Sequence, residues 1–463
     1  MPPRNAAIIA LTGLICLGMY VRAMEIRPAE PIADALLLID KRYIRDVPQR
    51  DLVDAAMRGI VSELDPYSNF LPPTRATALQ EELHQSFPGI GIMIEQPPGT
   101  DRVRVISPIV GSPAQRAGIM AGDILWTVGG KDTAKLKLDE IRNVLRGPEG
   151  TIVDIQLKRL GQDELIDVQV KRAEIPVDSV VGFYRGADDA WVYRLQEHPR
   201  IAYIRITMFG ERTSDEVATI LKSLDNDFSS LILDVRSNPG GLLNAAVDIC
   251  DLFLDAGVIV QTRERDNRLV EVISADPGKM VAEDKPLVVL VNGDSASASE
   301  VMAACLQGNG RAAIAGSRSF GKGTVQEVLA LESGRSLLKL TTAGFFGPDG
   351  QKIHREEDST EKDEWGVIPI PELLVPMDIE QQRGLHHSWT MATFPHAVMF
   401  EPPTDEESEK SQPNSETKPD SEPDAEVPVK APATKASSFQ DTQLERAIEY
   451  LLEKTKTSGK VAA

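Results

Sequence analysis

Short apolar runs that alternate with amphipathic segments are the feature that most constrains how this 463-residue chain can fold. Four such runs have the length of a strand: Ala202–Thr207, Leu231–Val235, Leu287–Val291 and Ala312–Ala315. Segments with helical spacing of apolar residues follow the first three runs, at residues 214–224, 241–254 and 297–306. This alternation predicts an α/β domain over residues 173–376.

Residues 82–172 show a different sequence pattern, in which short β-like runs are interrupted by glycines. The segment opens with Gly89, Ile90, Gly91 and Ile92. A glycine-rich loop that enters an edge strand can leave backbone N–H groups open to a carboxylate, and the strand edge can take up a peptide. The same Gly-x-Gly pattern is also typical of a plain tight turn, so both interpretations stand.

The N-terminus contains the one strongly apolar segment. Arg4 is followed by Ala6–Val21, which carries no charge. Its length lies between that of a signal-peptide core and that of a membrane span. We expect residues 1–24 to be a signal peptide or membrane anchor, with a buried internal helix as the alternative. Residues 31–78 follow with a helical pattern.

The C-terminal part predicts a linker and then a helix. Residues 401–437 are rich in Pro, Ser and Glu and have too few large apolar side chains to form a core, which predicts a disordered acidic linker. Beyond it, Leu444, Ile448, Leu451 and Leu452 share one helical face, so residues 439–455 should form an amphipathic helix that docks on the body.

Net charge argues against some classes of partner, and the cysteine content argues against some kinds of site. The formal net charge of −20 argues against nucleic acid or an anionic membrane surface as the main partner. The odd number of cysteines, with Cys250 and Cys305 in apolar helical runs, predicts buried small side chains and neither a disulfide framework nor a metal site.

Two junctions between a strand and a helix contain residues that suit chemistry. At the first, Gly240 and Gly241 would leave N–H groups at the positive end of a helix, where an oxyanion could bind, although a turn that merely needs glycine explains them equally well. At the second, Ser297 and Glu300 match the S-x-x-E capping box. A serine at a helix N-terminus is also a nucleophile if a base lies nearby.

Lys322 lies in a segment that almost matches a phosphate-binding loop. Gly316, Gly321 and Lys322 have the right spacing, but Gly323 replaces the Ser or Thr that would hold Mg²⁺. A lysine can act as a base if burial lowers its pKa from about 10.4 toward 7. The apolar surroundings of Lys322, including Phe320, fit such a site.

Several motifs occur in the order typical of one family: Leu64–Ser68, Ser112–Ala114, Ala117–Gly118 with Gly122–Asp123, Asp234–Leu242, Ser295–Glu300 and Phe320–Gln326. With these motifs the chain resembles the carboxy-terminal processing (tail-specific) serine proteases over about residues 36–375. The resemblance implies an α/β fold: a ClpP/crotonase-like protease core with an inserted β-rich PDZ domain at residues 82–172 and a small N-terminal helical region.

The resemblance also implies roles for individual residues. Ser297 corresponds to the nucleophile, Lys322 to the general base and Gln326 to the residue that positions the lysine, which the i, i+4 spacing would suit if a helical turn forms. The oxyanion hole corresponds to the N–H of Ala298 and to one of the pair Gly240 and Gly241. Some members have an acidic residue where this chain has Gly308, so catalysis is expected to rest on the dyad.

Further expectations follow from the same resemblance. The substrates are proteins or peptides with accessible C-termini, captured in a PDZ groove at Gly89–Ile92, and no cofactor or metal is required. The enzyme would be extracytoplasmic: periplasmic, or anchored to the inner membrane through an uncleaved N-terminal segment. Arg146 would report occupancy of the groove to the protease, and the oligomeric state is left open. The alternative is a PDZ-bearing scaffold or chaperone without proteolytic activity.

Overall fold

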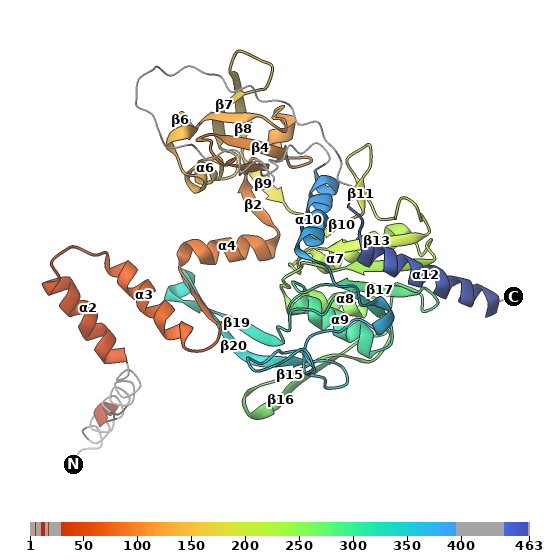
Figure 1. Cartoon of the computed structure of the whole chain (residues 1–463). Helices are drawn as coiled ribbons and strands as arrows, with labels where there is room; N and C mark the ends of the chain where they lie inside the picture. Colours follow the sequence, from red (N-terminus) through yellow and green to blue (C-terminus); the bar gives the residue numbers. More distant parts are fainter. Residues whose placement is uncertain (1–4, 6–10, 14–16, 18–28, 395–438, 462–463) are drawn as a thin grey trace, which may run out of the picture. The chain divides into compact units, whose positions relative to one another are not determined.

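The computed structural model describes residues 5, 11–13, 17, 29–394 and 439–461, which form two compact units (Figure 1). The first unit draws on residues 1–80 and 324–343, and the second on residues 81–323 and 344–463. No helix in the described ranges has the length and hydropathy needed to cross a membrane. Most of Ala6–Val21 and the whole of residues 401–437 lie outside those ranges, as does Cys16.

The first unit consists of two helices and a small antiparallel sheet. Helices α2 (Glu30–Arg42) and α3 (Gln49–Ser62) are followed by β1 (Asn69–Leu71), which pairs with β20 (Ser336–Phe346), itself paired with β19 (Thr324–Leu331). Region 31–78 therefore contains a strand as well as the expected helices. The Leu64–Ser68 motif forms the turn into β1, because the Asp65 carboxylate accepts the N–H groups of Tyr67 and Ser68 at 2.7 and 2.8 Å.

The second unit contains the predicted α/β core. Its sheet has the order β10-β13-β14-β17-β18, in which the last four strands are parallel. These strands are the four apolar runs of the sequence: β13 (Ile201–Ile206), β14 (Ser230–Asp234), β17 (Leu287–Val291) and β18 (Ala313–Gly316). Both faces of a parallel sheet are normally covered, which explains why apolar residues dominate these runs; Arg205 and Asp234 are the charged exceptions.

Helices connect and cover these strands: α7 (Thr213–Leu224), α8 (Leu243–Asp251) and α9 (Ala298–Gly308). Cys250 on α8 and Cys305 on α9 are buried free thiols, as predicted. The remaining elements of the core are the short strands β10 (Val180–Val181), β11 (Tyr184–Arg185) and β12 (Trp191–Val192), the strands β15 (Val258–Arg263) and β16 (Leu269–Ser274), and helix α10 (Ile379–Thr393).

The C-terminal helix α12 (Thr442–Val461) docks on this sheet (Figure 1). Leu444, Ala447 and Leu451 belong to one buried cluster with Ile232 of β14 and Val288 of β17. The amphipathic face predicted from the sequence is thus the face that packs on the core. Its partner is the sheet that also carries the strand-to-helix junctions singled out above.

A β-rich insertion occupies residues 86–176. Strands β2 (Ser86–Gly89) and β9 (Ala173–Pro176) pair with each other at its entry and exit. Between them lie a sheet and two helices: β3 (Ile92–Glu95), β4 (Val103–Pro108), β5 (Ile124–Val128), β6 (Lys131–Asp132), β7 (Ile152–Lys158), β8 (Ile166–Lys171), α5 (Pro113–Arg116) and α6 (Leu138–Leu145). Helix α4 (Pro73–His84) precedes β2.

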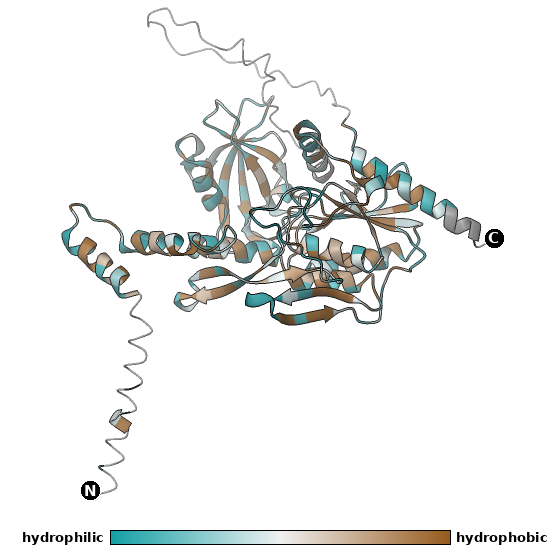
Figure 2. Ribbon diagram, turned by 60° about the horizontal axis from the view of Figure 1, so that its bottom comes forward, coloured by the Kyte–Doolittle hydropathy of each residue, from teal (hydrophilic) through white to brown (hydrophobic). Residues whose placement is uncertain are grey.

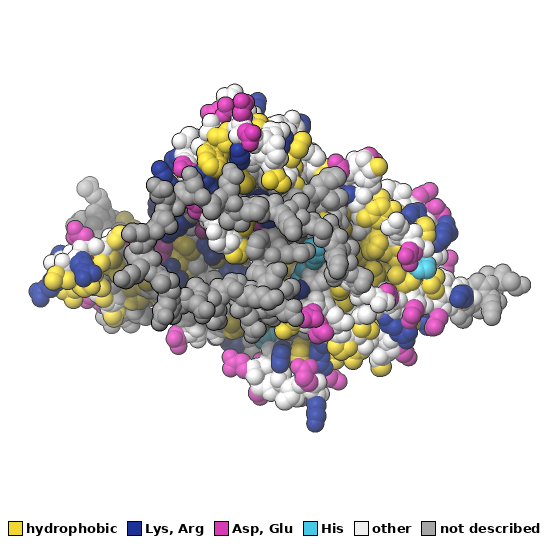
Figure 3. All heavy atoms as spheres, turned by 45° about the horizontal axis from the view of Figure 1, so that its top comes forward, with side chains coloured by type: hydrophobic (Ala, Val, Ile, Leu, Met, Phe, Trp, Pro, Cys, Tyr) yellow, Lys and Arg dark blue, Asp and Glu magenta, His cyan; other side chains and the backbone are white. Residues whose placement is uncertain are grey.

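The insertion has its own core, built from Val105, Leu125, Ile141, Leu157 and their neighbours. Figure 2 shows hydrophobic and hydrophilic residues alternating along its strands, as expected for a sheet with one buried face. On the molecular face drawn in Figure 3, acidic and basic side chains are interspersed over the described surface. The insertion is therefore a small domain with a separate hydrophobic centre.

Docking of α12 can be tested by truncating a buried side chain. Leu451 is fully buried against the sheet, so Leu451→Ala should lower the free energy of unfolding of the core by about 2–5 kcal/mol. Urea denaturation followed by far-UV circular dichroism measures this change. Glu449→Gln, on the exposed side of the same helix, is the matched control, and equal stability of both variants would contradict the docking.

Candidate active site

Ser297 occupies a strained turn immediately before α9. Its φ of 57° and ψ of −116° are uncommon for any residue other than glycine. Ala296, Ala298, Ser299 and Glu300 are buried, whereas Ser297 is only partly buried. The turn therefore presents this one residue to the surroundings.

The other two serines of the segment have structural contacts. Ser295 donates its hydroxyl to the Val235 carbonyl at 2.8 Å, and Ser299 donates to the Asn238 carbonyl at 2.9 Å. Both bonds tie the segment to the loop after β14. The structure thus separates the roles that the sequence left open: two serines fix the turn, and Ser297 is left accessible.

Gly240, the first glycine of the pair, lies directly against Ser297. A Cβ atom on Gly240 would lie 2.8 Å from the Ser297 Cβ and 2.7 Å from the Ala296 carbonyl oxygen, so only glycine allows this approach. A Cβ on Gly241 would lie 2.1 Å from the Phe209 carbonyl oxygen. Both glycines have positive φ values, of 101° and 145°. Both close approaches of the loop after β14 therefore require glycine.

Hydrogen bonding distinguishes the two glycines. The Gly240 N–H donates to the Asn238 Oδ1 at 2.8 Å. Within residues 29–394 and 439–461, the N–H groups of Gly241 and Ala298 have no hydrogen-bond acceptor. Of the alternatives that the sequence left open, Gly241 is the one whose N–H is available to a ligand.

The carboxylate of Glu300 connects the two candidate catalytic residues. Its Oε2 accepts the N–H of Ser297 at 2.9 Å and the N–H of Lys322 at 2.8 Å. Its Oε1 accepts the N–H of Gly321 at 2.7 Å and the hydroxyl of Ser319 at 2.6 Å. One side chain thereby fixes the main chain at both Ser297 and Lys322.

Glu300 is completely buried. Burial raises the pKa of its carboxyl group, and the hydrogen bonds from Ser319, Gly321, Ser297 and Lys322 oppose that increase. The sequence analysis assigned Glu300 only to a capping box. Its bond to the Ser297 N–H is the expected half of that motif, but the contacts with residues 319–322 were missed, since no local pattern connects them to α9.

The glycines around Lys322 serve close packing. A Cβ on Gly321 would lie 2.7 Å from the Arg355 Cβ, and one on Gly323 would lie 2.3 Å from the His354 backbone nitrogen. Lys322 itself is partly buried. The glycines that imitate a phosphate loop in the sequence therefore allow this segment to pass tightly against residues 353–355.

Gln326 does not adopt the expected helical turn. It lies in strand β19, where its side-chain amide donates to the hydroxyl of Thr324 at 2.8 Å and to that of Thr341 at 3.4 Å. The i, i+4 spacing supported this role only if a helical turn formed, and the chain is a strand from Thr324 onward, so that support does not apply. The role of Gln326 in positioning Lys322 stays a prediction from the resemblance.

Gly308, where an acidic residue was noted in some relatives, lies at the end of α9. A Cβ here would lie 3.1 Å from the ring of Pro348. The packing against Pro348 explains the glycine. Around this position and throughout the described ranges, no group of three or more His, Cys, Asp or Glu side chains could hold a metal ion.

The glycine-rich loop of the insertion is fixed from one side. Ile90 is buried and its carbonyl accepts the N–H of Ala114, while the Gly91 carbonyl accepts the hydroxyl of Ser112. Because the C=O and N–H of one trans peptide point in opposite directions, the N–H groups of Gly91 and Ile92 point away from α5. Gly89, the first residue of the predicted loop, instead pairs with Ala173 in the β2–β9 ladder at the entry and exit of the insertion.

Comparisons with known proteins agree with this architecture. The model of peptidase family S41 matches residues 200–364, and that of the PDZ domain matches residues 104–159. The carboxy-terminal-processing protease of Bartonella bacilliformis is 35% identical over 318 residues, which cover 67% of this chain and 69% of that protein. The chain belongs to peptidase family S41. It is a carboxy-terminal processing serine protease with a PDZ domain.

Other S41 relatives give a similar picture. The carboxy-terminal processing protease CtpA of Bacillus subtilis is 36% identical over 320 residues, covering 69% of this chain and 65% of that protein. Among solved structures, the photosystem II D1 C-terminal processing protease is 28% identical, with coverage of 75% of this chain and 92% of that one and a TM-score of 0.40. The two family models assign the α/β core to the protease and the β-rich insertion to the PDZ domain.

Replacement of Glu300 tests its connecting role. In Glu300→Gln the NH₂ of the amide would face two of the four donors and leave them unpaired. We therefore expect kcat to fall at least tenfold. The free energy of unfolding should fall by about 1–3 kcal/mol per unpaired donor. Peptide cleavage and urea denaturation measure the two effects. Glu372→Gln, at an exposed site, is the control, and wild-type activity of the Glu300 variant would contradict the role.

Proposed function

We propose that this S41 protease is an exported endopeptidase that uses a Ser297/Lys322 dyad and cleaves proteins near their C-termini after its PDZ domain has captured the tail. One observation carries the proposal. The accessible, strained Ser297 lies beside Gly240, Gly241 and Ala298, and the carboxylate that holds its N–H also holds that of Lys322.

The chemistry follows from these positions. Lys322, with its amine neutral, accepts the proton of the Ser297 hydroxyl as the oxygen attacks the scissile carbonyl. The negative charge that develops on the carbonyl oxygen is stabilised by the N–H groups of Gly241 and Ala298. Lys322 then donates the proton to the leaving amine, and water hydrolyses the acyl-enzyme with Lys322 again acting as base.

The proposed mode of tail capture uses the edge of the PDZ sheet. Strand β3 is the terminal strand in the order β3-β4-β5-β7-β8, so its outer edge can pair with an extended peptide. The N–H groups of Gly91 and Ile92 at its start can receive the terminal carboxylate. Specificity for free C-termini would come from this pair of donors.

Arg146 is placed to transmit occupancy of the groove. It follows α6, forms an ion pair with Glu81 of α4 at 2.8 Å, and lies over the ring of Phe87 in β2. It therefore joins the end of α6 to the segment through which the chain enters the insertion. We propose that peptide binding is sensed through this contact.

We further propose that the apolar segment 6–21 directs export, either to the periplasm or to an anchored position at the inner membrane facing the periplasm. Its charge-free sequence after Arg4 supports this assignment. Fractionation of a Gram-negative host should recover the protein outside the cytoplasm. Recovery in the cytoplasmic fraction would contradict the proposal.

The dyad is tested by removing each member. Ser297→Ala and Lys322→Ala should each lower kcat/KM for a peptide with a free C-terminus by at least about a thousandfold, while circular dichroism shows a retained fold. Ser223→Ala and Lys222→Ala, adjacent surface changes on α7, serve as controls. Undiminished cleavage by either dyad variant would reject the assignment. Binding without turnover by the wild-type enzyme would favour a silent scaffold.

The sensing role of Arg146 predicts a change in selectivity. The wild-type enzyme should prefer a peptide with a free carboxylate over its C-terminal amide, and Arg146→Ala should reduce this preference severalfold while both peptides still bind the PDZ domain. The ratio of the two kcat/KM values measures the effect. Arg142→Ala, on the exposed face of α6, is the control; an unchanged ratio for Arg146→Ala would rule out sensing through this contact.

A further inference from the structure

A buried arginine lies between two carboxylates at the carboxyl end of β14. The Arg236 side chain has no exposed surface. Its Nε and Nη2 contact the Asp234 carboxylate at 3.0 and 2.6 Å, and its Nη1 and Nη2 contact the Asp441 carboxylate at 2.9 Å each. Paired charge-assisted bonds of this kind fix position as well as charge. Arg236 therefore bridges the core strand and a residue 205 positions later in the chain.

Asp441 is also the N-terminal cap of α12. Its Oδ1 accepts the N–H of Leu444 at 3.1 Å, in addition to its bond with Arg236. Gln443, in the first turn, accepts a second bond from Arg236 at 3.2 Å and donates to the Val375 carbonyl at 2.7 Å. The first turn of α12 thus holds the guanidinium directly.

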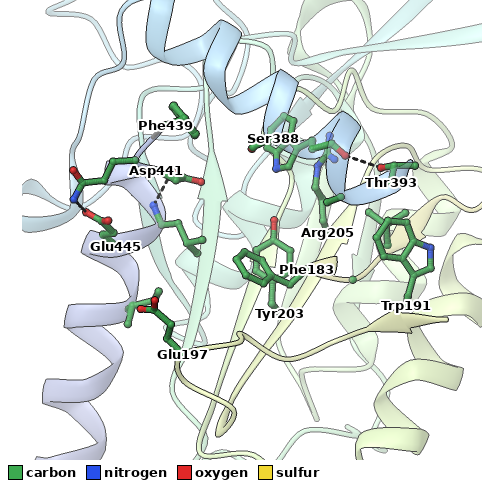
Figure 4. Close-up of a pocket in the computed structure, with 17 residues that line it drawn as sticks. Phe183, Trp191, Glu197, Tyr203, Arg205, Ser388, Thr393, Phe439, Asp441 and Glu445 are labelled. Carbon is green, nitrogen blue, oxygen red and sulfur yellow. Dashed lines mark hydrogen bonds between the residues drawn. The ribbon is translucent and has the colours of Figure 1, made fainter. Parts of the chain in front are cut away.

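The outer side of this arrangement borders a cavity of about 590 Å³ (Figure 4). Asp441, Tyr203 and Arg205 are among the residues that line it. The Asp441 side chain is 16% exposed, whereas those of Asp234 and Arg236 are fully covered. Asp441 is thus the member of the cluster that reaches the cavity wall.

Charge balance in this cluster depends on Asp441. Arg205, on the adjacent strand β13, stacks on the Trp389 ring at 3.5 Å and forms no ion pair with any described residue. Asp234 also accepts the Tyr203 hydroxyl at 2.7 Å. With Asp441 the cluster has two guanidinium groups and two carboxylates; without it, one carboxylate would face the fully buried Arg236 and the partly buried Arg205.

The same arginine begins the loop that carries Gly241, one of the two proposed oxyanion donors. The Arg236 N–H donates to Asp234, and two residues later Asn238 holds the Gly240 N–H and accepts the Ala296 N–H at its carbonyl. Gly241 follows directly. A shift of Arg236 would therefore displace the loop that sets the distance between Gly241 and Ser297.

We propose that Asp441 is a positioning residue for catalysis: by holding Arg236 it fixes the loop Val235–Gly241, so that docking of the C-terminal helix completes the oxyanion hole. The inference rests on the proposed roles of Ser297 and Gly241. It gives α12 a part in the reaction beyond covering the sheet. Any partner that displaces the first turn of α12 would lower the rate of acylation.

The test uses Asp441→Asn in the full chain. Asparagine caps a helix as well as aspartate does, so the substitution removes the charge and preserves the cap. We expect kcat to fall about 10- to 100-fold, which is no more than the fall in kcat expected when one oxyanion donor is removed. KM should change less than about twofold. Cleavage of a peptide with a free C-terminus measures both constants.

A transition-state analogue separates positioning from mere stability. A peptide aldehyde forms a tetrahedral adduct with an oxyanion, whereas the corresponding reduced-amide peptide does not. Affinity for the aldehyde should fall in parallel with kcat/KM, and affinity for the reduced amide should stay unchanged. Glu449→Gln, which removes an exposed carboxylate from the same helix, should retain the wild-type ratio of the two affinities.

The outcomes are distinguishable. Wild-type kcat and aldehyde affinity in Asp441→Asn, with Ser297→Ala inactive, would overturn the inference and leave the proposed function intact. Activity that survives Ser297→Ala would instead overturn the proposed function. If Asp441→Asn does not fold, Gln443→Leu is the second variant, because it removes the neutral contact to Arg236. A loss of about three- to tenfold in kcat and in aldehyde affinity would support the inference. No loss in either quantity would overturn it.

Discussion

A single buried carboxylate, that of Glu300, is the constraint on which the catalytic arrangement depends. An ionised group in the interior is costly unless hydrogen bonds replace its hydration. Glu300 obtains four donors from two segments of chain that are distant in sequence. Those donors include the N–H groups of Ser297 and Lys322. The hydrogen bonds that compensate the buried carboxylate therefore also fix the positions of these two residues.

The loop after β14 also approaches Ser297, and hydrogen bonds fix its main chain. Glycines at 240 and 241 permit contact with the turn, Asn238 orders their backbone, and Arg236 anchors the loop to the sheet and to α12. Buried ion pairs contribute little net stability, but they favour one arrangement over others. These contacts fix the main chain at Ser297, at Lys322 and at Gly240, while Ser297 stays only partly buried.

Much of this organisation could be predicted from sequence. Apolar runs located the strands of the parallel sheet, the amphipathic pattern of Leu444 and Leu451 predicted the docking helix, and family motifs pointed to Ser297 and Lys322. The local geometry after Lys322 was not predicted: the spacing argument for Gln326 depended on a helical turn, and the chain forms a strand from Thr324 onward. Glu300 and the Arg236–Asp441 pair were missed because their partners are brought together only by the fold.

We infer that Glu300 supports catalysis by holding Ser297 in register with Lys322. The most direct measurement is the rate at which a fluorophosphonate labels Ser297, which reports nucleophile reactivity without requiring PDZ capture. We expect labelling at Ser297 in the wild-type enzyme, none in Lys322→Ala, and at least tenfold slower labelling in a folded Glu300→Gln variant. Labelling of Glu300→Gln at the wild-type rate, or labelling at another serine, would contradict it.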